Sequence, residues 1–516
     1  GSLSSYSSSG SYFVKLTVTN SDGQTDLTGH TIRVLPEEVS GKSSPDPELF
    51  TTISSGEART LDPSEAYDSA SGQILSNTYE TLIFYDRDSV ENLIPVLAEE
   101  IPTKANGGIS DDGLTYTFNL RKGITFHDKS PMTADDVVFS INRLIIMDLP
   151  SGPAWMYTEL LDKTDADGDG IADSIEKIDE HTVQFRLNQS APRFLPILAY
   201  TGASIISKDW VTSKGCGNPI PGMECKAIQE EVMGTGPYMM NEETGGRWVH
   251  EQYIFMKYYP DYWRGWDSSS RQSYGANIVG SHIKEVLIKK NNDQSSRILE
   301  LLSGSADMVS VYPQYREEVI GQEGIDYIPR LDSLSMGFMG FNHNITNFEE
   351  TAPSADFFKN KDIRKAFCYS FDYDTFITDI KDGYGFQPTG PIPKGFTGYN
   401  SDGPKYSYDL EMAEMHFKEA GVWETGFTIT AYYNTGNIDR ENGLLLLENS
   451  IESLNDNFDI VVEGLEWPTY LDKYYAKEMS LFFLGWGPDY ADPHNYAHPF
   501  LHSDGHYPHT LDFSNS

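Results

Sequence analysis

Short apolar runs separated by turn residues recur along the chain and predict buried strands that alternate with helices. Residues 479–484 form a nearly continuous apolar run, and residues 115–121 alternate as a half-buried strand does. The pattern in residues 295–303 and 410–420 predicts two helices, the second of which stops at Gly421. This rhythm of strand and helix predicts an α/β fold.

The apolar run at 479–484 leads into residues 485–490, whose two glycines and one proline are expected to end the strand. Trp486, Asp489 and Tyr490 would then lie together where a sheet presents side chains to a cleft. The indole offers a stacking surface, and the carboxylate can hold an ammonium group. A capped strand end with a core tryptophan explains the same residues.

A run of histidines follows, spaced four residues apart from His494 to His506. On one helix this spacing would place metal ligands on one face. Pro499 and Gly505 argue against a continuous helix, so we expect a polar loop.

Composition limits the class of protein. The chain has 516 residues, of which 39% are hydrophobic and 13% aromatic, enough for two or three globular domains. A formal net charge of −39 argues against binding nucleic acid or an anionic membrane through a basic face. No apolar run is long enough for a transmembrane helix.

The cysteines and sequons favour an extracellular setting. Cys216 and Cys225 flank a turn-rich loop, and a disulfide between them is expected in an oxidising compartment, with two free thiols as the alternative. Sequons at Asn188 and Asn344 are compatible with a secreted protein.

An acidic segment at residues 165–176 has oxygen ligands at positions 1, 3, 5, 9 and 12 and glycine at position 6. This spacing wraps a loop around one hard cation, and Ca2+ prefers such ligands. The apolar residue falls at position 7, unlike an EF-hand, and a solvated acidic turn is the alternative. The expected ligands are Asp165, Asp167, Asp169, the Ile171 carbonyl, Asp173 and Glu176.

Residues 1–35 have their own pattern. Residues 11–19 and 29–35 alternate as strands around a turn, and this resembles the last hairpin of a PKD domain, a small β-sandwich of microbial cell surfaces. Residues 36–48 have the composition of a linker.

The rest of the chain, from residue 49 onward, resembles the extracellular solute-binding proteins of peptide ABC importers, the oligopeptide- and dipeptide-binding family 5. Residues 97–143 carry the most specific part of the resemblance, and residues 431–437, 462–470 and 485–490 continue it in the same order. The resemblance implies a two-lobed periplasmic-binding-protein-like fold of type II with an extra subdomain. Lobe I would span 49–285 with an insertion at about 76–185, and lobe II would span 286–516, truncated before its C-terminal return.

The resemblance also implies ligand-binding residues. Asp489 matches the acid that holds a peptide's α-amino group, and Trp467 and Trp486 match aromatics that line side-chain pockets. Basic residues that meet the peptide's C-terminus are not matched, which leaves Arg440 as a substitute. The expected ligand-binding set is Asp489, Trp486, Trp467, Tyr490, Asn434 and Tyr433.

The function implied is capture of peptides in a cleft between the lobes and delivery to ABC permease subunits. We expect a monomer, tethered to the outside of the cell, and no enzyme, because no set of nucleophile, base and orienting residue is evident. Oligosaccharide or metal-chelate binding on the same fold is one alternative. A cell-envelope structural or adhesive protein is another, and a hydrolase using Asp489 and Asp492 is the weakest.

Overall fold

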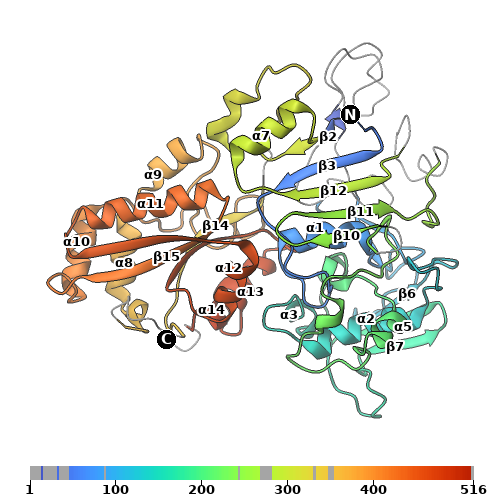
Figure 1. The fold of residues 1–516 in the computed structure, drawn as a ribbon. Helices are drawn as coiled ribbons and strands as arrows, with labels where there is room; N and C mark the ends of the chain where they lie inside the picture. Colours follow the sequence, from blue (N-terminus) through green and yellow to red (C-terminus); the bar gives the residue numbers. More distant parts are fainter. Residues whose placement is uncertain are drawn as a thin grey trace. The chain divides into compact units, whose positions relative to one another are not determined.

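The computed structural model describes residues 13–14, 32–33, 46–86, 89–241, 245–267, 282–328, 333–346 and 354–512. The chain divides into two compact units, drawn in Figure 1. Unit 1 comprises Gly1–Lys290, Leu299–Val309 and Gly321–Asp326, and unit 2 comprises the rest. Unit 1 is therefore made of one long segment that ends at Lys290 and two short later segments.

Unit 1 is built on a mixed sheet in the order β10-β11-β12-β3-β13, with β9 beside β11. Successive side chains of a strand point to opposite faces of the sheet. In β11, Ile254 and Met256 lie on the buried face, and Tyr253 and Phe255 lie on the half-buried face. Helix α1 packs Ile74 on the buried face. The bounds are β3 Leu49–Ser54, α1 Ser69–Thr78, β9 Tyr238–Met239, β10 Arg247–Val249, β11 Tyr253–Tyr258, β12 Glu285–Lys290 and β13 Met308–Val309.

A smaller sheet in the order β6-β8-β7 accompanies helix α2 in unit 1. Thr133 caps the start of this helix in a capping box, in which Asp136 accepts a hydrogen bond from the Thr133 backbone N–H. The bounds are β4 Ile83–Tyr85, β5 Leu93–Pro95, β6 Thr115–Asn119, α2 Ala134–Met147, α3 Trp155–Thr158, β7 Ile175–Asp179, β8 Thr182–Arg186, α4 Phe194–Leu198 and α5 Lys208–Ser213.

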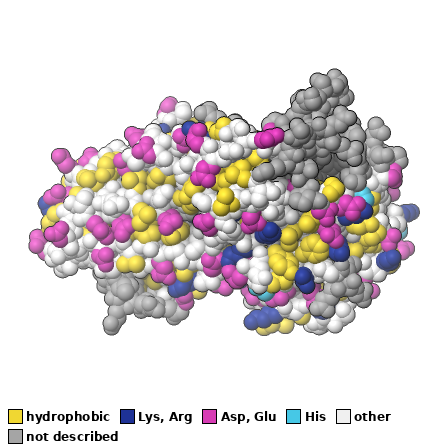
Figure 2. All heavy atoms as spheres, turned by 45° about the horizontal axis from the view of Figure 1, so that its top comes forward, with side chains coloured by type: hydrophobic (Ala, Val, Ile, Leu, Met, Phe, Trp, Pro, Cys, Tyr) yellow, Lys and Arg dark blue, Asp and Glu magenta, His cyan; other side chains and the backbone are white. Residues whose placement is uncertain are grey.

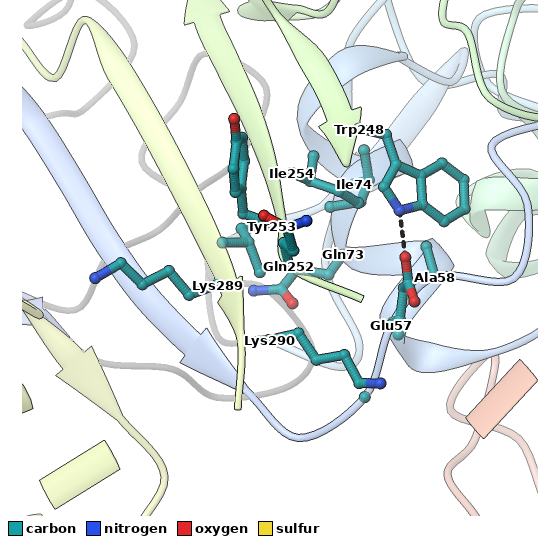
Figure 3. A pocket seen from close by; sticks show the side chains of 13 residues that line it. Glu57, Ala58, Gln73, Ile74, Trp248, Gln252, Tyr253, Ile254, Lys289 and Lys290 are labelled. Atoms are coloured by element: carbon teal, nitrogen blue, oxygen red, sulfur yellow. Dashed lines mark hydrogen bonds between the residues drawn. The ribbon is translucent and has the colours of Figure 1, made fainter. Parts of the chain in front are cut away.

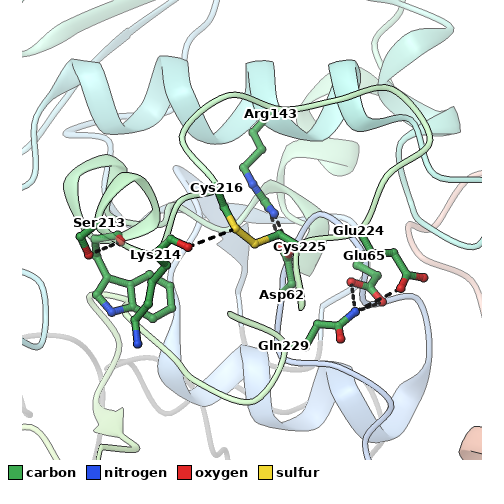
Figure 4. The surroundings of a disulfide bond; sticks show 10 residues. Asp62, Glu65, Arg143, Ser213, Lys214, Cys216, Glu224, Cys225 and Gln229 are labelled. Carbon is green, nitrogen blue, oxygen red and sulfur yellow. Dashed lines mark hydrogen bonds and ion pairs between the residues drawn. A yellow bond between two sulfur atoms is a disulfide. The ribbon is translucent and has the colours of Figure 1, made fainter. Parts of the chain in front are cut away.

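A buried ion pair and a disulfide hold the interior of unit 1 (Figure 4). Both terminal nitrogens of Arg143 donate to the Asp62 carboxylate at 2.5 Å, and neither side chain is more than 1% exposed. Cys216 and Cys225 are joined in a disulfide with their Cα atoms 6.2 Å apart.

A cavity of about 20 Å3 lies beside the main sheet of unit 1 (Figure 3). Glu57 lines it and accepts hydrogen bonds from the Trp248 indole at 2.6 Å and from the Glu251 backbone N–H at 3.1 Å. Such a volume has room for about one water molecule. The cavity is therefore too small to receive a peptide.

Unit 2 is built on a sheet in the order β14-β17-β15-β16, in which β15 is parallel to both neighbours and β14 is antiparallel to β17. Aromatic rings fill its core: Phe427 and Phe458 stack with centroids 4.5 Å apart, and Phe417 lies 4.8 Å from Phe458. The bounds are β14 Met336–Phe341, α8 Lys361–Ser370, α9 Tyr373–Thr375, α10 Leu410–Glu419, β15 Phe427–Asn434, α11 Ile438–Glu452, β16 Phe458–Leu465, α12 Trp467–Tyr475, β17 Leu481–Trp486, α13 His494–Leu501 and α14 His506–Thr510.

Helix α7, Gln294–Ser303, runs from one unit into the other and agrees with the helix predicted at 295–303. Of the predicted N-terminal hairpin, the structure describes only β1 Phe13–Val14 and β2 Ile32–Arg33, which pair antiparallel. The remainder of the PKD-like segment lies outside the described residues.

On the face shown in Figure 2, Asp and Glu side chains are scattered over the described surface, and Lys and Arg are fewer. This agrees with the net charge of −39. Within the part of the chain that the structure describes, no helix has the length and apolarity needed to cross a membrane.

Candidate functional site

The three parallel strands of the unit 2 sheet end along one edge. Asn434 at the end of β15 pairs with Leu465 at the end of β16, and β17 ends at Trp486. In open α/β sheets, ligands bind where the carboxyl ends of strands meet. The strand-end site consists of residues at these ends or just after them: Tyr433, Asn434, Arg440, Trp467, Trp486, Asp489 and Tyr490.

Asn495 holds Asp489 in place. The amide of Asn495 donates to Asp489 Oδ2 at 2.9 Å, and its Oδ1 accepts from the Asp489 backbone N–H at the same distance. Asn495 is fully buried and Asp489 is 8% exposed. The sequence reasoning missed Asn495, because it lies in α13, where a loop was expected.

The prediction of a loop at 494–506 is wrong, and the reason lies in Pro499. Helix α13 contains Pro499, which has no N–H to donate to the Asn495 carbonyl one turn earlier. That carbonyl instead accepts the indole N–H of Trp486 at 2.9 Å. The expected break occurs at Gly505, after which α14 begins at His506.

Arg440 follows β15 in the first turn of α11 and points back to the strand ends. Its guanidinium donates to Asn434 Oδ1 at 2.6 Å and lies 5.9 Å from the centre of the Trp467 ring. Among the described residues, no carboxylate lies within salt-bridge distance of Arg440. Burial lowers the pKa of Arg440 from its ordinary value.

Gly485 makes room for that guanidinium. A Cβ at this position would lie 3.1 Å from Arg440 Nη2. The strand was expected to end before Gly485, but β17 continues through it because Gly337 and Met336 of β14 pair with Gly485 and Trp486. The glycine therefore serves a close approach rather than a strand break.

The two tryptophans of the site differ in accessibility. Trp486 is 7% exposed and packs against Phe500 and Tyr507, so its ring stabilises α13 and α14. Trp467 is half-buried at the start of α12 and stacks on Tyr470 with centroids 5.7 Å apart. Trp467 is therefore the tryptophan with surface to offer a ligand.

The two tyrosines are also placed differently. Tyr490 is 1% exposed, and its hydroxyl lies 2.8 Å from Nδ1 of His494. Tyr433 is half-buried, and burial together with the Glu441 carboxylate raises its pKa to about 12. The Tyr433 phenol is therefore neutral at physiological pH and can donate a hydrogen bond.

The acidic loop of unit 1 brings together three of its expected cation ligands. Carboxylate oxygens of Asp165, Asp167 and Asp173 lie within 4.8 Å of one another. Asp169 and Glu176 lie outside that group, since Asp169 accepts from the Ile171 backbone N–H and Glu176 belongs to β7.

Asn142 of α2 fixes the acidic loop to the body of unit 1. Its amide nitrogen donates to the Gly170 carbonyl and its oxygen accepts from the Ala172 N–H, both at 2.9 Å. The loop leads directly into strand β7, so its flanks differ from the helices of an EF-hand.

Comparison with known proteins gives the family. The family model described as bacterial extracellular solute-binding proteins, family 5 Middle, matches residues 92–508. A probable D,D-dipeptide-binding periplasmic protein of Escherichia coli is 26% identical over 457 residues, covering 89% of this chain and 78% of that protein. Heme-binding protein A of Haemophilus influenzae is 26% identical over 453 residues, covering 85% of this chain and 73% of that protein.

The fold is shared with solved structures. Listeria monocytogenes OppA bound to peptide matches with a TM-score of 0.72 at 18% identity, covering 90% of this chain and 86% of that one. The two-lobed periplasmic-binding-protein-like α/β fold expected from the sequence is therefore confirmed. Because the family match spans most of the chain and includes the whole strand-end site, the chain belongs to the family 5 extracellular solute-binding proteins.

Proposed function

We propose that this protein captures peptides at the strand-end site and delivers them to the permease of an ABC importer. The observation that carries the proposal is the placement of two opposite charges at one sheet edge. Asp489 is oriented by Asn495, and Arg440 is oriented by Asn434. A peptide with free termini carries the complementary pair of charges.

Each end of the peptide would meet a defined group. The Asp489 carboxylate would accept the α-ammonium group, because charge-assisted hydrogen bonds are stronger than neutral ones. The Arg440 guanidinium would receive the terminal carboxylate, and the Trp467 ring would contact a side chain. Backbone hydrogen bonds would add affinity without selecting a sequence. Binding of this kind needs no catalytic step.

Calorimetric titration with di-, tri- and tetra-alanine tests the proposal. Asp489→Asn is expected to weaken trialanine binding by at least about 30-fold, because it removes the charge that faces the ammonium group. Asp459→Asn is the matched control, since Asp459 is exposed at the start of β16 and away from the strand ends. It should leave the affinity unchanged.

N-acetylated trialanine, which lacks the α-ammonium charge, tests whether Asp489 holds that group. It should bind the wild-type protein and Asp489→Asn equally weakly, because the ammonium charge is already absent. If acetylation and the substitution weaken binding independently, Asp489 does not hold the ammonium group.

Native mass spectrometry of the purified protein distinguishes the other cargoes. A co-purified sugar, heme or metal chelate would keep the importer and change its cargo, and heme is the ligand named for the Haemophilus influenzae relative. A protein that carries nothing and ignores the alanine peptides would favour a structural role in the cell envelope.

We also propose that the acidic loop binds Ca2+ and that the PKD-like segment tethers a monomeric protein outside the cell. The convergence of Asp165, Asp167 and Asp173 supports the first proposal, and the β1–β2 pairing agrees with the hairpin on which the second rests. Calcium titration of the wild type and Asp165→Asn tests the loop, and sedimentation tests the monomer.

A further inference from the structure

A second set of metal-ligating side chains lies on helices α8 and α10 of unit 2. His416 Nδ1 is 3.0 Å from Asp362 Oδ1 and 3.3 Å from Glu419 Oε2. One ligand atom from each of the three residues lies within 4.8 Å of the others. None of these residues belongs to the strand-end site or to the acidic loop of unit 1.

The fold holds the imidazole rigidly. His416 is 4% exposed, and its ring stacks on Tyr369 of α8 with centroids 5.8 Å apart and an angle of 8°. The two helices lie side by side (Figure 1). Phe367 of α8 and Phe417 of α10 contact each other in the core of unit 2. Nδ1 is therefore fixed in direction toward both carboxylates.

The two carboxylates lie on the solvent-facing side of the buried nitrogen. The side chains of Asp362 and Glu419 are 35% and 54% exposed. Solvent can therefore reach the space between the three ligand atoms and supply a water as a fourth ligand.

We propose that Asp362, His416 and Glu419 bind one Zn2+ ion. Zinc bonds to imidazole nitrogen and carboxylate oxygen are about 2.0–2.2 Å, so neighbouring ligand atoms of a tetrahedron lie about 3.3 Å apart. The two distances from Nδ1 are close to this value. An imidazole among the ligands distinguishes the site from the all-oxygen acidic loop, which suits Ca2+.

Zinc must replace a proton at Nδ1. A charged imidazolium would release one proton on binding, and a neutral ring would move its proton to Nε2, leaving the Nδ1 lone pair for the metal. Protons and the metal therefore compete for this nitrogen.

The test is Zn2+ titration by calorimetry, with Co2+ absorption as the spectroscopic probe of a nitrogen-containing tetrahedral site. Excess Ca2+ is present throughout to occupy the acidic loop. Glu419→Gln is expected to weaken Zn2+ binding at least tenfold, and Asp362→Asn should do the same. Thermal unfolding without metal verifies that both variants fold.

Two matched controls complete the experiment. Glu414→Gln lies on the same helix and removes only an ion pair with Lys418, so it should not change Zn2+ affinity. His498→Asn removes a ring from the stacked row of His494 and His498 on α13 and His502 at its C-cap, a histidine cluster that could compete for the metal. If Zn2+ binding survives Glu419→Gln and Asp362→Asn, or is lost in His498→Asn, the proposal is overturned.

Discussion

Two arginines, one in each unit, are placed in different ways. Unit 1 buries Arg143 against a partner of opposite charge, Asp62. Unit 2 fills its interior with phenylalanine rings and places Arg440 at the end of its sheet against a neutral amide, Asn434. The comparison distinguishes an arginine paired with a buried carboxylate from one that the proposed peptide could supply with a carboxylate.

The physical reason is the cost of desolvation. A buried charge whose partner is removed is strongly destabilising, because the remaining charge has lost both water and its counter-charge. A charge at a sheet edge, oriented by an amide, can acquire its counter-charge from a ligand. Substitutions that remove one charge from each unit should therefore differ in their effect on stability and on binding.

Arg143→Met is expected to have the largest effect on stability. Asp62, which is fully buried, would lose its only salt-bridge partner among the described residues. The free energy of unfolding should fall by about 3–5 kcal/mol, measured by urea unfolding with a probe in unit 1. Replacing both residues with apolar side chains should recover much of this loss. A loss below 1 kcal/mol would show that the pair does not maintain unit 1.

Glu80 gives unit 1 a pH-dependent stability. Its carboxylate accepts hydrogen bonds from Thr235, Tyr262 and Trp263, but burial outweighs them and raises its pKa from 4.5 to about 7. Between these values the folded state binds more protons than the unfolded state, so stability should fall as the pH rises. The full effect of this shift is about 3 kcal/mol at neutral pH and above.

Glu80→Gln tests this directly, since the amide does not ionise and the Tyr262 hydroxyl can turn to accept from it. The variant should lose the Glu80 part of the decline in unfolding free energy between pH 5 and 8. Glu65 also has a pKa raised to about 7 by burial, so a smaller slope should persist. An unchanged slope would contradict the assignment.

Calcium should stabilise unit 1 and leave unit 2 unchanged. At a free concentration one hundred times the dissociation constant, a bound ion adds about 2.7 kcal/mol to the unfolding free energy. In zinc-free protein, removal of calcium should therefore lower the unfolding temperature of unit 1 alone, detected by calorimetry. Asp165→Asn should behave as the calcium-free protein does, and any response of unit 2 would point to a different calcium site.

Local patterns in the sequence predicted most of the elements that could be checked. The helices predicted at 295–303 and 410–420 follow from the spacing of neighbouring side chains, and both agree with the structure to within about two residues. The returns of the chain between the units depend on tertiary packing, which no local pattern carries.

The site was partly predictable for the same reason. Asp489 and Trp467 follow strand ends, which a strand prediction can place. The role of Asn495 depends on the carbonyl that Pro499 leaves without a helical donor, and the role of Gly485 depends on the approach of Arg440. Both are contacts across the fold, so the sequence alone pointed instead to a loop and a broken strand.

Arg440→Met is expected to have the smallest effect on stability and provides the sharpest contrast with Arg143→Met. The same substitution removes a guanidinium in both cases, but the Arg440 partner is the neutral Asn434 amide. The free energy of unfolding should therefore fall by about 1–2 kcal/mol, less than in Arg143→Met, because the group left without its donor is a neutral amide oxygen rather than a buried carboxylate.

Arg440→Met should affect peptide binding more strongly than it affects stability. Arg440→Met should weaken trialanine binding by at least about tenfold, because the terminal carboxylate loses its charged partner. Trialanine amide, which lacks that charge, should bind the wild type and the variant alike. If Arg440→Met instead destabilises the protein as much as Arg143→Met does, Arg440 maintains the fold, and the division between structural and ligand-binding charges fails at the residue where it matters most.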